Sequence, residues 1–237
     1  MSALLALEAV EARYGPVQAL RGVSLEVDEG SVVAVLGANG AGKTTTLRAV
    51  SGTVRRTGEI TFAGKPLRGG PEAVARAGIA HVPEGRGTFT ELTVVENLKL
   101  GAYTRRERSL KADIDRVAQW FPWIPARGGQ PAAALPYGTQ KRVVMARALM
   151  AQPTFLLLDE PAGGLNHEEV EELGDFIVRL RDERALTILL VEHHMSLVMR
   201  VSDHVNVLSF GRKIASGPPA QVQADPAVIQ AYLGAPE

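Results

Sequence analysis

The stretch GANGAGKTT at residues 37–45 decides the fold of this chain, because it matches the pattern G-x-x-x-x-G-K-[ST] at every restricted position. The apolar run SVVAVL at residues 31–36 precedes it and predicts a buried strand, and TTLRAV at residues 45–50 predicts the start of a helix. The pattern requires a strand before it and a helix after it, and both are present here. The sequence therefore predicts a phosphate-binding loop.

The residue types in this loop suit polyphosphate. Gly37, Gly40 and Gly42 lack a Cβ, so the backbone can curl and direct N–H groups at an anion. The positive end of the following helix faces the same place. Lys43 can reach the β- and γ-phosphates, and the Thr44 hydroxyl can bind Mg²⁺. The other loop positions that we expect to contact nucleotide are Ala38, Asn39, Ala41 and Thr45.

Composition limits the possible classes of protein. The chain has 237 residues, of which 46% are hydrophobic, with 26 basic and 26 acidic residues and no Cys. This suits one large α/β domain, excludes disulfides and thiolate metal sites, and gives no electrostatic reason to expect nucleic acid as the main partner. Residues 1–10 do not read as a signal peptide, and no apolar run is long enough to span a membrane.

Local patterns predict the order of elements along the chain. Antiparallel strands are expected near 5–10, 24–27 and 58–64, followed by a helix at 72–77 and a strand at 78–83. Helical periodicity then dominates 94–100, 110–121 and 140–149, with a loop at 122–134. Alternation resumes with strands at 154–158 and 187–191 and helices at 167–183 and 195–201, then a hairpin at 205–215 and a helix at 226–233.

A second group of polar residues follows the strand LLL at residues 156–158. Ligands of such sheets bind at the carboxyl ends of strands, so Asp159 and Glu160 are expected beside the phosphates. Asp159 could hold Mg²⁺ directly or through water, and Glu160 could polarise a water for attack on the γ-phosphate.

Two histidines follow the strand at 187–191. His193 lies just past the strand end and could hydrogen-bond the γ-phosphate. His194 is adjacent and faces another way, so only one of the two can serve. A metal-binding histidine pair is not expected, because there is no Cys and no matching third ligand is obvious in the sequence.

At this point the chain resembles the ATP-binding subunit of ABC transporters, from about Leu5 to Leu233. Seven family elements have counterparts here in the family's order. They are the adenine-stacking aromatic Tyr14 with Val17 close after it, Walker A at 37–45, the Q-loop at 81–86, the signature at 135–140, Walker B ending in Asp159 and Glu160, the D-loop at 162–166, and the switch histidine His193.

The resemblance implies a P-loop NTPase (RecA-like) α/β core with an N-terminal antiparallel β subdomain and an inserted α-helical subdomain. The whole of 1–237 is then a single ABC ATPase domain, with 1–85 and 149–237 as the nucleotide-binding core and 86–148 as the helical subdomain. ATP and Mg²⁺ are the implied cofactors. Glu84 would be a further Mg²⁺ ligand, in place of the family's Gln.

The signature region departs from the family pattern. Its residues expected to contact ATP across a dimer are Leu135, Pro136, Tyr137, Gly138, Thr139 and Gln140. Pro136 replaces the family's serine and supplies neither a hydroxyl nor a backbone N–H. Tyr137 replaces the first glycine, so the backbone there approaches phosphate less freely. Gly138 and the helix start near Thr139 could still close the site.

Further motifs are similar to the ATPase subunits of branched-chain amino-acid importers, namely VPEGR at 82–86, TVVENL at 93–98 and LPYG at 135–138. Such importers carry two different ATPase subunits, and the sequence leaves open which type this is. The implied partners are a second ATPase subunit, integral membrane permease subunits and, indirectly, a solute-binding protein, at the cytoplasmic face of the membrane. The alternatives are a soluble ABC-type ATPase and an ATP-binding module that does not hydrolyse.

Overall fold

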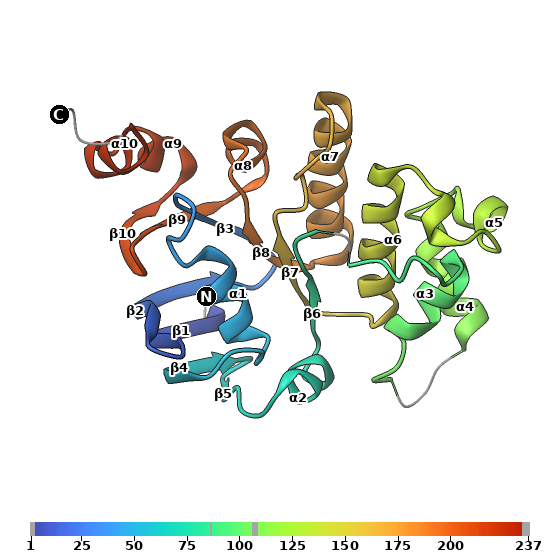
Figure 1. Ribbon diagram of the computed structural model, residues 1–237, viewed down its shortest axis with the longest axis horizontal. Helices are drawn as coiled ribbons and strands as arrows, with labels where there is room; N and C mark the ends of the chain where they lie inside the picture. The colour runs from blue at the N-terminus through green and yellow to red at the C-terminus, as the bar shows by residue number, and fades with distance from the viewer. Residues whose placement is uncertain (1–2, 86, 106–108, 234–237) are drawn as a thin grey trace.

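A six-stranded sheet forms the centre of the molecule (Figure 1). The computed structural model describes residues 3–85, 87–105 and 109–233. The strand order is β10-β9-β3-β8-β7-β6, and all neighbours are parallel except β9 and β10. The strands are β3 (Val32–Leu36), β6 (Ile79–Val82), β7 (Phe155–Asp159), β8 (Thr187–Val191), β9 (His204–Ser209) and β10 (Arg212–Gly217).

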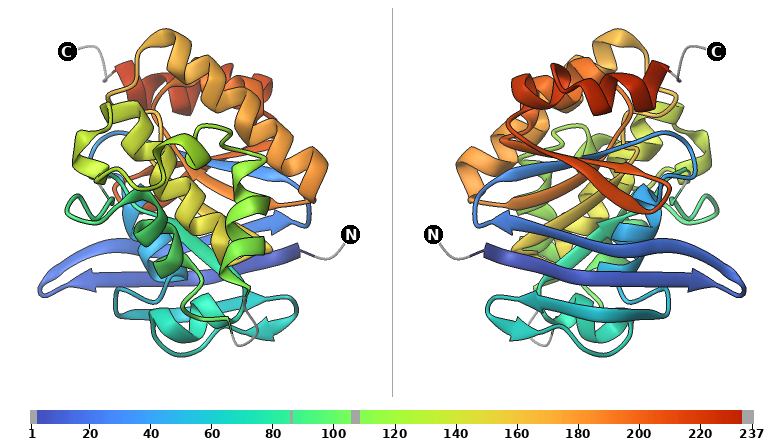
Figure 2. Two further views of the ribbon diagram at one scale, coloured as in Figure 1. Left: turned by 90° about the vertical axis from the view of Figure 1, so that its right-hand side faces the viewer. Right: turned by 90° about the vertical axis from the view of Figure 1, so that its left-hand side faces the viewer.

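An antiparallel sheet covers one face of this central sheet (Figure 2). Its order is β2-β1-β4-β5, and its strands are β1 (Ala3–Tyr14), β2 (Val17–Asp28), β4 (Arg56–Phe62) and β5 (Lys65–Pro66). Helix α1 (Lys43–Val50) shares one hydrophobic core with both sheets, through Leu47 and Val50. The loop before α1 is therefore fixed between two layers.

Helices cover the other face of the central sheet. The two faces of β3 show why its sequence is continuously apolar: Val33 and Val35 lie in the core shared with the antiparallel sheet, whereas Val32 lies in the core on the helical side. Strands buried on both faces lose the usual polar alternation. The strands expected from short apolar runs are confirmed for this reason.

The helices in chain order are α1, α2 (Pro71–Arg76), α3 (Val94–Gly101), α4 (Leu110–Ala118), α5 (Ile124–Arg127), α6 (Tyr137–Met150), α7 (His167–Arg184), α8 (Met195–Val201), α9 (Pro219–Gln223) and α10 (Pro226–Leu233), with a 3₁₀ turn at Ala132–Ala134. Side chains cap the N-termini of two of these helices. Thr93 with Glu96 forms a capping box at α3, and Asn166 with Glu169 forms one at α7.

The sequence-based prediction was wrong in several places. Residues 122–134 are not one loop, because α5 and the 3₁₀ turn lie within them; Pro125 stands in the first turn of α5, where proline is tolerated. Helix α6 begins at Tyr137 rather than 140, with Pro136 as its N-cap. Strand β5 and helix α9 were not predicted. These results confirm the predicted α/β class with an N-terminal antiparallel sheet. The division of the chain into a nucleotide-binding core and a helical subdomain, at 85/86 and 148/149, stays a prediction. Helix α6 continues past the second boundary to Met150. Arg86, at the first boundary, lies outside the described residues.

Candidate functional site

The loop after β3 has a shape that packing forces on it. Gly37, Gly40 and Gly42 all have positive φ, at 151°, 81° and 105°. A Cβ on Gly37 would lie 2.4 Å from the carbonyl oxygen of Leu208, and one on Gly42 would lie 2.8 Å from Leu20 Cδ2. A Cβ on Gly40 would meet nothing within 4 Å. Two of the three glycines are therefore required by close packing as well as by φ.

Lys43 folds back over this loop. Its side chain is 6% exposed, and Nζ donates to the Gly37 carbonyl at 2.9 Å and to the Ala38 carbonyl at 3.4 Å. It also lies 3.9 Å from Glu160 Oε1. Residues 38–40 are exposed, whereas Ala41 and Thr45 are buried. The ammonium group thus donates its hydrogen bonds to loop carbonyls, and an anionic ligand can take the place of these carbonyls as the acceptor.

Thr44 and Asp159 meet beside Lys43. Thr44 Oγ1 donates to Asp159 Oδ1 at 3.1 Å, and Asp159 is 2% exposed. Burial raises the pKa of Asp159 to about 6, and the negative charges of Glu84 and Glu160 add to this, whereas the Thr44 hydrogen bond and Arg48 oppose it. Glu84 itself is exposed. A buried carboxylate with this pKa is a place where a cation stabilises the charged form.

Glu160 and His193 come together because their strands are neighbours. Asp159 on β7 pairs with Val191 on β8, so the residues that follow leave the sheet side by side. Glu160 has φ +46° and donates its N–H to the Val191 carbonyl at 2.9 Å. Its Oε2 lies 3.5 Å from Nδ1 of His193, whose side chain is 51% exposed.

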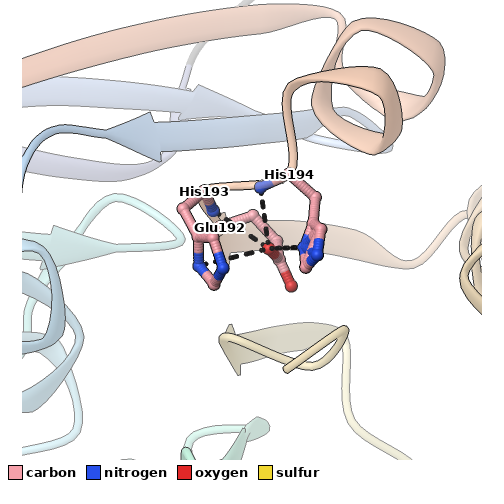
Figure 3. Close-up of side chains that lie close together, drawn as sticks. All are labelled: Glu192, His193 and His194. Atoms are coloured by element: carbon pink, nitrogen blue, oxygen red, sulfur yellow. Dashed lines mark hydrogen bonds and ion pairs between the residues drawn. The ribbon is translucent and has the colours of Figure 1, made fainter. Parts of the chain in front are cut away.

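Glu192 was not singled out from the sequence. It is 0% exposed, and its carboxylate accepts from the backbone N–H groups of Ala162 at 2.7 Å, His193 at 2.9 Å and His194 at 3.2 Å. Figure 3 shows this carboxylate between the two imidazole rings. It therefore ties the turn after β7 to the turn after β8. The feature of the sequence that could have identified Glu192 is its position, as an acidic residue directly after the apolar strand at 187–191.

Lys141 on α6 was also not singled out from the sequence, because its role depends on burial against a distant turn. Its side chain is 7% exposed, and Nζ donates to the carbonyls of Glu160 at 3.2 Å and Pro161 at 3.1 Å. Burial lowers the pKa of Lys141, and nearby carboxylates oppose this. Helix α6 is thus attached to the turn that carries Glu160.

The residues 135–140 lie apart from the loop at 37–45. Figure 1 shows α6 on the side of α3–α5, with β6 and β7 between α6 and α1. Leu135 and Gly138 are buried, Pro136 is exposed, and Thr139 is half-buried. The Tyr137 hydroxyl donates to the Gly163 carbonyl at 3.5 Å, and Gln140 Nε2 donates to the Leu135 carbonyl at 2.9 Å. The structure does not bring this segment to the phosphate loop of its own chain.

Tyr14 and Val17 stand on either side of the β1–β2 turn. They are 41% and 62% exposed. Arg48, in the last turn of α1, donates to the Tyr14 hydroxyl at 3.3 Å and so links the β1–β2 turn to this helix. The two residues offer an exposed apolar surface at this edge.

Fold and site geometry together define an ATP-binding cassette. The chain belongs to the ABC transporter family: the family model described as "ABC transporter" matches residues 20–163, more than half of its length. A further model, described as "Branched-chain amino acid ATP-binding cassette transporter", matches residues 212–237. Within the described part of the chain, no helix has the length and apolar character needed to cross a membrane.

The curated relatives narrow the resemblance. LivG of Salmonella typhimurium is 37% identical over 249 residues, covering 98% of each chain, and BraG of Pseudomonas aeruginosa is 37% identical over 233 residues, covering 98% of this chain and 100% of BraG. Both are described as high-affinity branched-chain amino acid transport ATP-binding proteins. The family resemblance drawn from the motifs is confirmed.

Two solved structures of ATP-binding cassettes have the same fold as this chain. The ADP conformation of MJ1267, an ATP-binding cassette of an ABC transporter, has a TM-score of 0.88 at 26% identity, covering 99% of this chain and all of that one. A nucleotide-free ATP-binding cassette from an ABC transporter has a TM-score of 0.89 at 25% identity, with the same coverage.

Proposed function

We propose that this protein is the ATP-hydrolysing subunit that powers an ABC importer for branched-chain or other amino acids. The observation that carries the proposal is that Lys43, Thr44, Asp159, Glu160 and His193 lie together at the carboxyl ends of β3, β7 and β8. This is where ligands bind to parallel α/β sheets. The amino-acid assignment is supported by the names of the relatives and by the match at residues 212–237.

ATP binding would use the phosphate loop and the edge at Tyr14. The β- and γ-phosphates replace the Gly37 and Ala38 carbonyls as partners of Lys43, and the N–H groups of the loop and of the start of α1 bind the remaining oxygens. The adenine ring stacks on Tyr14 beside Val17. Arg48 already holds the Tyr14 ring by its hydroxyl.

The donor set at Thr44 and Asp159 fits Mg²⁺. A hydroxyl and a buried carboxylate oxygen 3.1 Å apart are hard ligands, and burial, which raises the pKa of Asp159, disfavours its charged form until a cation binds. Glu84 adds a further oxygen from the exposed loop after β6. When bound, the ion would neutralise charge on the β- and γ-phosphates.

Hydrolysis would depend on Glu160 and His193. The Glu160 carboxylate accepts a proton from the water that attacks the γ-phosphate, and the exposed imidazole of His193 donates a hydrogen bond to a γ-phosphate oxygen. The positive φ of Glu160 turns its side chain out of the strand line toward Lys43 and His193. Strain at such a position is common where a group must be aimed.

The second half of the site would come from a second ATPase subunit. In a head-to-tail pair, residues 135–140 of one subunit face the phosphate loop of the other, with ATP between them. Pro136 lacks a hydroxyl and an N–H, so the N–H groups of Gly138 and Thr139 in the first turn of α6 take over the contact with the γ-phosphate. Hydrolysis then removes a contact shared by both subunits and lets them part.

Sequence identity does not decide which of the two ATPase subunit types of such importers this chain is, because LivG and BraG are both 37% identical to it. The second subunit in the pair is therefore either another copy or a homologue of the other type. In both cases the pair carries two composite sites, and the variants below act on the half that this chain supplies.

A groove of about 500 Å³ would receive the permease subunit. It lies between the core and the helices of residues 86–148, which form the helical subdomain in our proposal. Its exposed apolar side chains are Phe89, Leu100 and Tyr103, at 53%, 44% and 76% exposure. A zero-charge chain offers lipid no electrostatic attraction, so we place it at the cytoplasmic face of the membrane through this protein contact. A solute-binding protein would act through the permease.

The test is Glu160→Gln beside the exposed control Glu168→Gln. We expect Glu160→Gln to keep ATP affinity, to lower Mg²⁺-dependent kcat by about 10²–10⁴-fold, and to form a dimer in ATP that sedimentation detects. Glu168→Gln should match wild type in all three. Unchanged turnover in Glu160→Gln would remove this residue from the catalytic role.

A further inference from the structure

Two imidazoles and two carboxylates converge at the end of β8. His193 Nδ1 lies 3.5 Å from Glu160 Oε2 and 3.9 Å from Glu192 Oε2, and His194 Nδ1 lies 3.5 Å from the same Glu192 oxygen. Among the described residues, Glu192, His193 and His194 are the one group whose potential metal-ligand atoms all lie within 4.8 Å of one another (Figure 3). The sequence suggested no third ligand for the histidines, and the fold supplies Glu192.

These separations fit a shared cation better than hydrogen bonds. An N–H···O bond spans about 2.7–3.2 Å, which is shorter than all three gaps. Two ligands of one tetrahedral Zn²⁺, each about 2.0–2.2 Å from the metal, lie about 3.4 Å apart. Nδ1 of His194 is closed off from solvent and has no hydrogen-bond partner. In a neutral imidazole an unprotonated Nδ1 would face the carboxylate oxygen as a second acceptor, so a positive charge between them is favoured.

The surroundings already hold the donors in place. Glu192 is 0% exposed and is oriented by three backbone N–H groups. Supporting hydrogen bonds of this kind fix ligand orientation in metal sites. The Ala162 N–H binds Oε1, whereas the N–H groups of His193 and His194 bind Oε2, the oxygen that faces both imidazoles. The two imidazoles, with ring centroids 4.5 Å apart, are 51% and 34% exposed and can adjust.

We propose that His193, His194 and Glu192 form a binding site for a nitrogen-preferring divalent transition metal such as Zn²⁺, with water as the fourth ligand. Imidazole donors favour Zn²⁺ over Mg²⁺, so this site differs from the oxygen site at Thr44 and Asp159. Metal here takes up the lone pair of His193, whose Nδ1 lies 3.5 Å from Glu160, and so blocks ATP hydrolysis. Binding stands on the geometry alone, whereas the inhibition rests on the proposed function.

The first experiment measures Zn²⁺ binding without nucleotide, by calorimetry and by competition with a chromogenic chelator. The test variant is His194→Asn, because Asn keeps a good N-cap for α8, and the control is His167→Ala, which removes an exposed histidine elsewhere. We expect one Zn²⁺ per chain in wild type and in the control, and at least about tenfold weaker binding in His194→Asn. No binding by wild type, or equal binding by His194→Asn, overturns the site.

The second experiment measures Mg²⁺-dependent ATP hydrolysis with and without Zn²⁺. We expect Zn²⁺ to inhibit wild type and His167→Ala, and His194→Asn to keep the basal rate and to require at least about tenfold more Zn²⁺ for inhibition. Stoichiometric Zn²⁺ binding without inhibition overturns the inhibitory role. An inactive wild type that still binds one Zn²⁺ overturns the proposed ATPase function and leaves the metal site standing.

Discussion

The phosphate loop and the segment 135–140 present their backbones to solvent in different ways. At the loop, packing behind the backbone fixes its shape, with Gly37 against Leu208 and Gly42 against Leu20, while residues 38–40 stay exposed. At 135–140, side chains cover the backbone: the Tyr137 ring lies against Gly164, and Gly138 lies against Glu169. In our proposal, the phosphate loop is one half of the ATP site and is already shaped within the chain, whereas 135–140 is the half that contacts nucleotide on a second subunit.

Substitutions at two loop glycines test the first half of this comparison and should have the largest effect. Gly37→Ala combines positive φ with a Cβ 2.4 Å from a backbone oxygen, so it should lower the free energy of unfolding by about 3 kcal/mol or more. Gly40→Ala has space for its Cβ and should cost only about 1 kcal/mol. Urea unfolding measures both. Equal losses would mean that φ alone, and not packing, shapes the loop.

The raised pKa of Asp159 makes a pH-dependent prediction. Its folded pKa of about 6 exceeds the unfolded value of 3.8, so the folded state holds more protons between these pH values, and stability falls as pH rises through them. Above about pH 6 the cost is at most about 3 kcal/mol. Nucleotide-free Asp159→Asn should therefore be more stable than wild type at pH 7.5 and nearly equal to it at pH 4.

Urea unfolding at the two pH values checks this, with Asp28→Asn as an exposed control. Asp159→Asn should also lose Mg²⁺-dependent ATP binding. If Asp159→Asn and wild type are equally stable at pH 7.5, burial of the charged Asp159 carboxylate does not destabilise the nucleotide-free protein, and this interpretation is wrong.

The smallest effect is expected at Pro136, and it tests the second half of the comparison. Pro136→Ser supplies an N-cap hydroxyl to α6 and should stabilise the protein by about 1 kcal/mol relative to Pro136→Ala. If the serine hydroxyl also contacts ATP across the pair, kcat should rise severalfold in Pro136→Ser alone. Both variants restore the backbone N–H, so an equal gain in both would assign the effect to the N–H instead.

Much of the fold was predictable because strong local patterns coincide with tertiary burial. The runs at 31–36, 154–158 and 187–191 are apolar because both sheet faces are covered, and the loop at 37–45 has a fixed flanking strand and helix. Helix α5 was missed because four residues with one proline carry no periodicity. Short elements of this kind depend on packing that a single sequence does not display.

The site was predictable where it follows a strand end and not where it depends on long-range packing. Asp159, Glu160 and His193 were expected at one edge, because parallel strands deliver their following residues together. Glu192 and Lys141 were not, because their roles depend on burial: each binds main-chain atoms of a distant turn. Their roles, like those of the other site residues, stay predictions until the variants are measured.

The contact of Lys141 has a mechanical consequence. Its ammonium group joins α6, which begins within the segment that we propose faces the second subunit, to the carbonyls of Glu160 and Pro161. A rotation of α6 relative to α1 would therefore pull on the turn that carries Glu160, whose carboxylate lies 3.9 Å from Lys43 and 3.5 Å from His193. The orientation of α6 would thereby set the distance between the proposed base, Glu160, and the phosphate loop.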